Sequence, residues 1–494
     1  MSAEGMGKTP HYLVLDQGSH ASKALVFAAG GELLAAREAP LAVRRPRADW
    51  VEHDANEVVD SLRRAIAAVL AAPDLAAAGI DAAGLAIQRS SVVCWDRRTG
   101  EALSPVLSWQ DRRNAAWLAA QAFDPDRLRR ITGLVASPHY GASKLRWCLD
   151  ELPAVRRALA EGRLCCGPLA SFVLHRLLEE RPFLVDPANA SRTLLWDVRT
   201  HDWSAKMLAA CGLPESSLPR CVPSRHAFGT LQAGGQRIPL QAMTGDQSAA
   251  LFAWGAPRGD TLFVNIGTGA FVQRLVAGAP PDVPGLLHSV AWQDEDHSVG
   301  VLEGTVNGAG AALEWLASER GVPIDTLLES APRWLDESDD PPLFINGVGG
   351  LGAPYWVADC PIRFSRAGSL AEHAVAVLES IVFLLQRNIE AMRESPGGQA
   401  DVARRIIVSG GIARFAGVCE RLSDLSGLIV ERPADVEATA RGLAWLLSGN
   451  VARGEIVPTC FAPQVNAALQ SRYTRWREAL ESGVAGLVAT RRGA

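Results

Sequence analysis

The chain has 494 residues, of which 48% are hydrophobic and 21% charged, and its formal net charge at pH 7 is -5. This length predicts two or more domains, each large enough to bury its own core. The negative charge and the lack of a basic stripe with interleaved aromatics give no reason to expect a nucleic-acid partner. No apolar run approaches the roughly 18 residues that span a bilayer, so no membrane association is expected.

The nine cysteines are scattered singly, except for Cys165-Cys166, and form no CxxC pair. An odd, unpatterned set is typical of reduced thiols, most of them small core residues. Residues 1–10 have no apolar segment of the kind that a signal peptide requires. We therefore expect a cytoplasmic protein.

The first half is expected to open with strands and to continue with a helix. The strands are predicted at 12–16, 23–29, 32–36, 84–88 and 92–95, with a further strand ending at Ser108. An amphipathic helix begins after its N-cap, Asp54, and its apolar stripe consists of Val58, Val59, Leu62, Ile66, Val69 and Leu70. From about Asp124 to Leu240 the pattern indicates mainly helices and loops, with Pro-rich breaks near 214–223.

The second half repeats this order of elements. A strand-turn-strand spans 262–273 around Gly267-Thr268-Gly269, and a helix carries Trp315. A Gly/Pro-rich loop at 346–356 is followed by a long helix at 370–393, a strand at 405–409, Gly410-Gly411 and a further helix. The two halves therefore indicate a coarse internal duplication, although their sequence identity is slight.

Asp246 lies near the middle of the chain, where an apolar strand ending at Gly245 meets an Ala/Leu-rich helix. A carboxylate at a helix N-terminus stays ionised, so Asp246 can either serve as a general base or simply cap the helix. Each half also carries a turn of glycine and hydroxyl residues, at Gly18-Ser19 and at Gly267–Gly269. Two such turns with an acid between them favour a cleft over a cap.

Three other motifs are set aside. Gly5-Met-Gly-Lys-Thr9 resembles the end of a P-loop but follows no strand, and 347–352 matches GxGxxG but is followed by Pro354 where a helix should start. Tyr140-x-x-x-Lys144 resembles a short-chain dehydrogenase pair, but the chain lacks the matching glycine-rich loop. Only four of the 49 basic residues are lysines, and two of them, Lys23 and Lys144, fall in motif-like stretches.

The strands, the two glycine-and-hydroxyl turns and the Asp246 segment together resemble the FGGY carbohydrate kinases, and within them the glycerol kinases most closely. The resemblance runs from roughly Tyr12 to Gly449. The most specific segments are Leu15–Gly18, Trp50–Asp54, Trp109–Arg113, Asn189–Thr193, Gly245–Gln247, Gly267–Gly269, Leu302–Gly304 and Gly350–Trp356. So many matches in the same order make chance an implausible explanation.

The resemblance implies an α/β protein with two actin-like (ribonuclease H-like) ATPase domains that flank a catalytic cleft. The substrate-side domain would span 11–250 and the nucleotide-side domain 251–450, with a helical tail at 451–494 packed on the core. The implied reaction is transfer of the γ-phosphate of ATP to a hydroxyl of a small polyol or sugar, with Mg²⁺ as cofactor. Positioning and charge neutralisation dominate such chemistry. The resemblance leaves open a homodimer.

The resemblance also assigns roles at the cleft. Asp246 would accept the proton of the attacking hydroxyl, and Asp16 would lie near Mg²⁺, through water. Backbone N–H groups at Gly18 and Gly267–Gly269 would hold the phosphates. The implied ATP-binding residues are Gly18, Ser19, His20, Lys23, Gly267, Thr268, Gly269, Gly310, Gly410 and Gly411. His20 replaces a usual threonine, and 412–415 lacks the usual Asn or Ser, so both sites depart from the family pattern.

The substrate pocket departs from the pattern of glycerol kinases. The implied pocket residues are Arg89, Ser90, Trp109, His139, Tyr140, Asp246, Gln247 and Phe271. Ser90 stands in place of a glutamate and His139 in place of a tyrosine, which removes a charge-assisted acceptor for two hydroxyls and leaves space. We therefore expect a polyol or ketose of four to seven carbons to be a better substrate than glycerol. Two alternatives stay open: Tyr140 fills the vacated place and glycerol still binds, or the protein is a weakly catalytic nucleotide-binding sensor.

Overall fold

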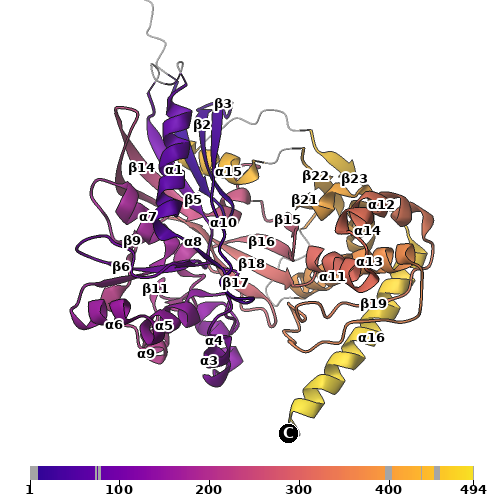
Figure 1. Ribbon diagram of the computed structural model, residues 1–494. Helices are drawn as coiled ribbons and strands as arrows, with labels where there is room; N and C mark the ends of the chain where they lie inside the picture. Colours follow the sequence, from indigo (N-terminus) through magenta and orange to yellow (C-terminus); the bar gives the residue numbers. More distant parts are fainter. Residues whose placement is uncertain are drawn as a thin grey trace, which may run out of the picture.

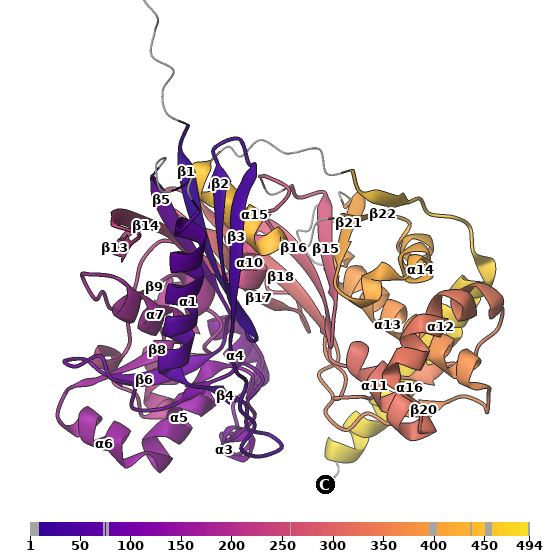
Figure 2. The same ribbon diagram turned by 45° about the horizontal axis from the view of Figure 1, so that its top comes forward.

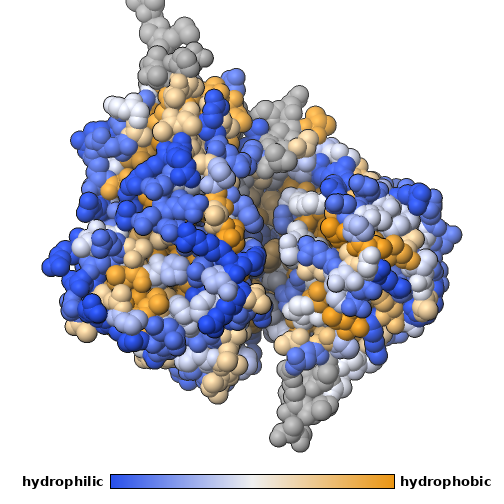
Figure 3. Space-filling view, viewed as in Figure 1, coloured by the Kyte–Doolittle hydropathy of each residue, from blue (hydrophilic) through white to orange (hydrophobic). Residues whose placement is uncertain are grey.

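The computed structural model describes residues 9–72, 75, 79–256, 258–394, 403–434, 437–449 and 457–492. Two large mixed sheets lie in two lobes, with the N-terminal half in the first lobe and the later strands in the second (Figure 1). A second view shows the two lobes side by side (Figure 2). The space-filling surface is hollowed between them (Figure 3). Within the described residues, no helix has the length and apolar character that a membrane span needs.

The first sheet has six strands in the order β13-β14-β5-β1-β2-β3. Their bounds are β1 (His11–Gln17), β2 (Ala21–Ala28), β3 (Leu33–Pro40), β5 (Ala82–Ile87), β13 (Arg225–Ala233) and β14 (Gln236–Gly245). β1, β2 and β3 pair antiparallel, whereas β5 runs parallel to β1 and β14 runs parallel to β5. The carboxyl ends of β1, β5 and β14 therefore meet at one edge, and a site is expected there.

The second sheet has seven strands in the order β17-β18-β16-β15-β21-β22-β23. Their bounds are β15 (Thr261–Ile266), β16 (Ala270–Ala277), β17 (Leu287–Gln293), β18 (Ser298–Val306), β21 (Arg405–Ser409), β22 (Ile429–Arg432) and β23 (Thr459–Phe461). β15, β16 and β18 pair antiparallel, β21 runs parallel to β15, and β22 runs parallel to β21. This plan repeats that of β1, β2, β3, β5 and β14, so the internal duplication predicted from the sequence is present in the topology.

A smaller four-stranded sheet, β4-β7-β6-β8, extends the first lobe. Its strands are β4 (Glu52–His53), β6 (Val92–Asp96), β7 (Val106–Leu107) and β8 (Leu164–Pro168). The remaining strands form short pairs: β10 (Trp196–Asp197) with β11 (Asp202–Trp203), β9 (Leu184–Val185) with β12 (Arg220–Cys221), and β19 (Phe344–Ile345) with β20 (Arg363–Phe364). The helices around it include α3 (Ala115–Ala120), α4 (Pro125–Thr132), α5 (Gly141–Glu151), α6 (Pro153–Ala160), α7 (Leu169–Leu177), α8 (Pro187–Ala190) and α9 (Ala205–Cys211). Many apolar side chains of these helices and of the small sheet form a separate cluster that contains Tyr140 and Leu145.

Two predicted helices form as expected. α1 (Ala55–Leu70) begins after Asp54, whose side chain accepts hydrogen bonds from the N–H groups of Asn56 and Glu57, and its predicted stripe is buried. α13 (Leu370–Arg393) begins with a capping box formed by Ser369 and Glu372. Both helices begin at a strong N-cap. α1 adds an apolar face at helical spacing, whereas α13 is buried on all sides from His373 to Gln386.

The prediction that residues 124–240 are mainly helices and loops is wrong at its C-terminal end. β13 and β14 form a hairpin there, and its turn consists of Gly234 and Gly235 with φ of 56° and 74°. Positive φ at both positions matches the turn that joins antiparallel strands, so the Gly-Gly pair was the signal for a hairpin.

The helices of the second lobe are α11 (Gly310–Arg320), α12 (Ile324–Glu337), α13, α14 (Ala416–Ser426) and α16 (Ala467–Arg492). Leu469, Tyr473, Trp476 and Leu480 of α16 belong to the apolar core of this lobe. Arg472 fixes the helix further, since it donates two hydrogen bonds, of 2.9 and 2.7 Å, to the buried carboxylate of Glu379 on α13. The predicted domain boundaries remain predictions.

α15 (Ala438–Ser448) returns to the first lobe and packs against β1, β5 and the short α10 (Asp246–Ala250). Gly442 allows this contact, because a Cβ at this position would overlap the carbonyl oxygen of Ala249. The first sheet is thus covered by α1 on one side and by a helix from the C-terminal part of the chain on the other.

Glu379→Ala should lower the free energy of unfolding by about 3–5 kcal/mol, because it leaves Arg472 and Arg421 without their buried counter-charge. Denaturant titration followed by tryptophan fluorescence measures the change. Glu337→Ala, which removes the exposed partner of Arg333, is the control and should cost less than about 1 kcal/mol. Equal effects of the two substitutions would contradict this role of Glu379.

Candidate active site

The first hairpin brings Asp16 and Lys23 opposite one another on β1 and β2. Burial and, after it, the negative charge of Asp246 raise the pKa of Asp16 to about 7. Lys23 donates a 2.8 Å hydrogen bond to Glu437. Burial lowers the pKa of Lys23, but this bond and the charge of Glu437 outweigh burial, so its pKa is raised. The ammonium group predicted to neutralise a phosphate is thus already paired with a carboxylate.

Two of the backbone amides that were expected to hold phosphate close their own turns instead. The N–H of Gly18 donates to the carbonyl of Ala21 and that of Gly267 to the carbonyl of Gly269, both at 2.9 Å. The N–H of Gly310 likewise donates to Gly267, and those of Ala309 and Ala311 donate to Thr268. These bonds dock the first turn of α11 onto the second hairpin.

Two cavities lie beside residues that are predicted to bind ATP. One, of about 830 Å³, contains Asp246, Gln247, Phe271, Gly410 and Gly411. The other, of about 190 Å³, contains Gly267, Thr268, Gly310 and Gly411. Gly410 is required by its φ of 97° and by the backbone of Ile266, which leaves no room for a Cβ. Five of the ten predicted ATP-binding residues thus line two cavities that share Gly411.

Asp246 is the first residue of α10, and Gly245 occupies the N-cap position without a side-chain cap. The Oδ1 of Asp246 accepts a 2.7 Å hydrogen bond from the N–H of Gln247. Burial raises the pKa of Asp246, whereas the charge of Arg89 lowers it. The sequence-based argument that the helix N-terminus keeps Asp246 ionised thus leaves out burial, which raises its pKa, and a raised pKa makes a carboxylate a stronger base.

A smaller cavity, of about 120 Å³, lies next to Asp246. It is lined by Ser19, Gln88, Arg89, Ser90, Trp109, His139, Arg192, Asp246, Gln247 and Phe271. Seven of the eight predicted substrate residues therefore meet at one place. Tyr140 does not line this cavity: it is 3% exposed, and its ring packs edge-on against that of His139 and under the guanidinium of Arg192.

The two substituted positions have defined roles. Ser90 has a φ of 64°, in the left-handed region, and its hydroxyl donates to the carbonyl of Arg192 at 3.2 Å. The ring centroid of His139 lies 5.5 Å from that of Trp109. Burial and then the positive charges of Lys144, Arg192 and Arg89 hold the pKa of His139 well below its usual range, so its imidazole is neutral at physiological pH.

Arg192 and Glu303 are not among the predicted site residues, although both lie in segments that carry the family resemblance. Glu303 on β18 is fully buried and accepts hydrogen bonds from Arg192 at 3.2 Å and from Gln273 at 2.9 Å. Its carboxylate also lies 3.9 Å from Arg89. Arg89, whose expected glutamate neighbour is Ser90, thus has a carboxylate from the second lobe nearby.

The carboxylates fit a magnesium ion that arrives with nucleotide. Asp16 and Asp246 are close enough for the charge of one to raise the pKa of the other, which a cation near Asp16 would relieve. Mg²⁺ commonly binds through one or two carboxylates together with phosphate oxygens and water. In the part of the chain that the structure describes, no group of three or more His, Cys, Asp or Glu residues is placed to hold a metal ion.

Comparisons with known proteins identify the class. The model of the FGGY family of carbohydrate kinases, N-terminal domain, matches residues 11–253, and that of the C-terminal domain matches residues 262–449. The chain belongs to the FGGY family of carbohydrate kinases. It is a phosphotransferase with an alcohol group as acceptor.

Among its relatives is a glycerol kinase from Geobacter sp. (strain M21), which is 35% identical over 88% of this chain and 89% of its own length. A glycerol kinase from Symbiobacterium thermophilum is 32% identical over 95% of this chain and 98% of its own. The structure superposes on Plasmodium falciparum glycerol kinase with ADP (TM-score 0.84, 21% identity, covering 97% and 99% of the two chains). Xylulose kinase from Rhodospirillum rubrum gives a TM-score of 0.80 at 19% identity, covering 97% and 99%. These structures share the two-domain α/β fold.

Asp246→Asn should lower kcat by about 10²–10⁴-fold, since it removes a general base without changing the size of the side chain. A coupled ADP-release assay measures turnover, and isothermal titration measures ATP affinity, which should be retained. Asp60→Asn, on the outer face of α1, is the control and should leave both unchanged. Undiminished turnover in Asp246→Asn would mean that Asp246 is not the base.

Glu303→Gln should raise the KM for the acceptor and lower the free energy of unfolding by about 3–5 kcal/mol, because Arg192 and Arg89 lose their buried counter-charge. Arg192→Met alone should be similarly destabilising. The double variant should cost less than the sum of the two, by at least about 1 kcal/mol, because the residues interact directly. Simple additivity in denaturant titrations would contradict the pairing.

Proposed function

We propose that this kinase transfers the γ-phosphate of ATP to a hydroxyl of a polyol or ketose of four to seven carbons. The pocket next to Asp246 carries the proposal. Ser90 and a neutral His139 stand where glycerol kinases have a glutamate and a tyrosine, and the Ser90 hydroxyl already bonds the backbone of Arg192. The pocket therefore offers fewer acceptors to a compact triol and more room to a longer chain.

The position of Tyr140 also supports a longer substrate. Its side chain is packed between His139 and Arg192 and does not line the cavity. Burial raises the pKa of its phenol to about 12, so it remains neutral. The alternative in which Tyr140 restores the glycerol pocket would require it to leave this packing.

The proposed roles divide between the acceptor and the nucleotide. Asp246 accepts the proton of the attacking hydroxyl, while Arg89 and Gln247, which bond one another, orient the acceptor with Trp109 and Phe271. The hydroxyls of Ser19 and Thr268 face the phosphates, and Gly310, Gly410 and Gly411 lie along the nucleotide. Mg²⁺, held near Asp16, would neutralise phosphate charge. His20, exposed at the end of the first turn, remains a predicted phosphate contact, as does Lys23 through a rearranged pair with Glu437.

Glycerol kinase proper is the second candidate, and the names of relatives that are about one-third identical favour it. The weakly catalytic sensor is the third candidate. It is less favoured because the chain keeps Asp16, Thr268 and Asp246, and a binding module needs no general base. A cytoplasmic location agrees with nine free cysteines. A homodimer remains a prediction.

A coupled ADP-release assay with Mg-ATP against glycerol, erythritol, pentitols, pentuloses and a heptulose tests the substrate class. We expect a C4–C7 acceptor to exceed glycerol in kcat/KM by at least tenfold. The double variant Ser90→Glu, His139→Tyr, which restores the glycerol-kinase pattern, should shift the preference toward glycerol.

Glycerol as the best acceptor by tenfold would overturn the proposal in favour of the second candidate. No turnover with any acceptor, while ATP still binds, would favour the sensor.

A further inference from the structure

We propose that Lys144 is a positioning residue that sets the shape of the acceptor pocket by fixing the backbone of Ser90 and His139. This inference rests on the proposed function, because it concerns the pocket at which the acceptor would bind. Ser90 and His139 are also the two positions at which this pocket departs from glycerol kinases. A single buried ammonium group thus holds both positions that we expect to determine specificity.

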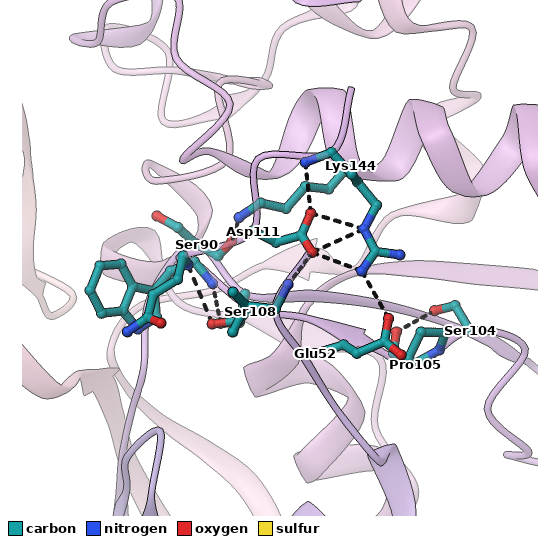
Figure 4. A network of polar contacts seen from close by, with 12 residues as sticks. Glu52, Ser90, Ser104, Pro105, Ser108, Asp111 and Lys144 are labelled. Carbon is teal, nitrogen blue, oxygen red and sulfur yellow. Dashed lines mark hydrogen bonds and ion pairs between the residues drawn. The ribbon is translucent and has the colours of Figure 1, made fainter. Parts of the chain in front are cut away.

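The contacts of Lys144 are directed at these two residues. It lies in the first turns of α5 and is 1% exposed. Its Nζ donates a 3.0 Å hydrogen bond to the carbonyl of Ser90 and a 2.7 Å hydrogen bond to the carbonyl of His139. Figure 4 shows Lys144 reaching toward Ser90 with Asp111 close by. Ser90 follows β5 and His139 precedes α5, so Lys144 joins two loops that lie far apart in the sequence.

The conformation of Ser90 makes this restraint necessary. Its φ of 64° lies in the left-handed region, which costs a residue with a Cβ free energy. Such a conformation persists only where surrounding bonds enforce it, and Ser90 has two: the one from Lys144 to its carbonyl and the one from its own hydroxyl to Arg192. Loss of the first would release the carbonyl and let the loop relax toward ordinary φ values.

The network around Lys144 provides its counter-charge. The pKa of Lys144 is lowered to about 7, because burial and the charge of Arg113 lower it more than the charge of Asp111 raises it. Asp111 is fixed by hydrogen bonds from Arg113 at 2.9 and 2.7 Å and from the N–H of Val51 at 2.7 Å. Arg113 in turn bonds Glu52 at 2.8 Å. Lys144 and Arg113 thus face two carboxylates, Asp111 and Glu52, which offset part of the cost of burying these groups.

Two substitutions separate positioning from general support of the fold. Lys144→Met keeps the length and apolar stem but removes every donor, whereas Lys144→Gln keeps two N–H donors on a slightly shorter chain. Arg146→Met, two residues along α5 and engaged mainly with the exposed Asp150, is the control. KM and kcat are measured for three substrates in turn: ATP, glycerol, and the acceptor that the wild type uses best. Hydrogen–deuterium exchange is measured on peptides that cover 86–93, 134–143 and 262–273.

We expect Lys144→Met to raise the KM for the acceptor at least tenfold while the KM for ATP stays within twofold. Lys144→Gln should lie between it and the wild type, and Arg146→Met should match the wild type. Exchange should increase at 86–93 and 134–143 and remain unchanged at 262–273. If the bonds of Lys144 only supported the fold, their loss would change the KM for ATP and the KM for the acceptor alike, and the amide of Lys144→Gln would not restore the acceptor KM.

An acceptor KM within twofold of the wild type would overturn the proposal, as would an equal rise of both KM values with faster exchange in all three peptides. If Lys144→Met does not fold, Lys144→Gln is judged by an acceptor KM raised at least threefold with the same limits on ATP and exchange. If the wild type itself turns over no acceptor, the proposed function fails, and the exchange pattern alone decides the role of Lys144.

Discussion

A buried carboxylate, Glu303, holds the active site together across the two lobes. It comes from the second sheet, yet it neutralises Arg192 and lies close to Arg89, both from the first lobe. Burying guanidinium groups without a counter-charge is strongly unfavourable. Arg89 in turn constrains the chain beside it, because its side chain packs so closely on Gly245 that a Cβ there would overlap it. The residue after Gly245 is Asp246, so the position of this proposed base depends on a charge supplied by the other lobe.

This dependence links chemistry to the relation between the lobes. The acceptor pocket combines Arg89, Trp109 and His139 from the first lobe with Phe271 from the second. A kinase must also exclude water from the reacting phosphate, and closure of two lobes over a cleft is a common way to do so. Residues that cross the cleft, such as Glu303 and Phe271, make the geometry of the pocket sensitive to that closure.

The sequence allowed some of this to be predicted, for identifiable reasons. α1 could be located because it combines an N-cap with helical periodicity, α13 because an N-cap opens a long and mostly apolar run, and Asp246 because a carboxylate at a strand-to-helix junction stands out. The hairpin of β13 and β14 is absent from the predicted elements, although its Gly-Gly turn is the local signal for one. The pairs Arg192–Glu303 and Lys23–Glu437 join residues 111 and 414 positions apart, and no local pattern records which distant charges a fold brings together. The turn amides of Gly18 and Gly267 show the same limit, since only the folded hairpin reveals that they are already bonded.

The return of α15 to the first lobe affects how the protein is made. Val14, Leu25 and Ala86 of the first sheet share an apolar cluster with Leu443 and Leu447 of α15. During synthesis the ribosome completes β1, β2 and β5 hundreds of residues before α15 emerges. One apolar face of the first sheet therefore stays uncovered until nearly the whole chain has been translated. The N-terminal lobe therefore completes this core only late in translation, and a fragment that ends after Ala250 would keep that face exposed and prone to aggregate.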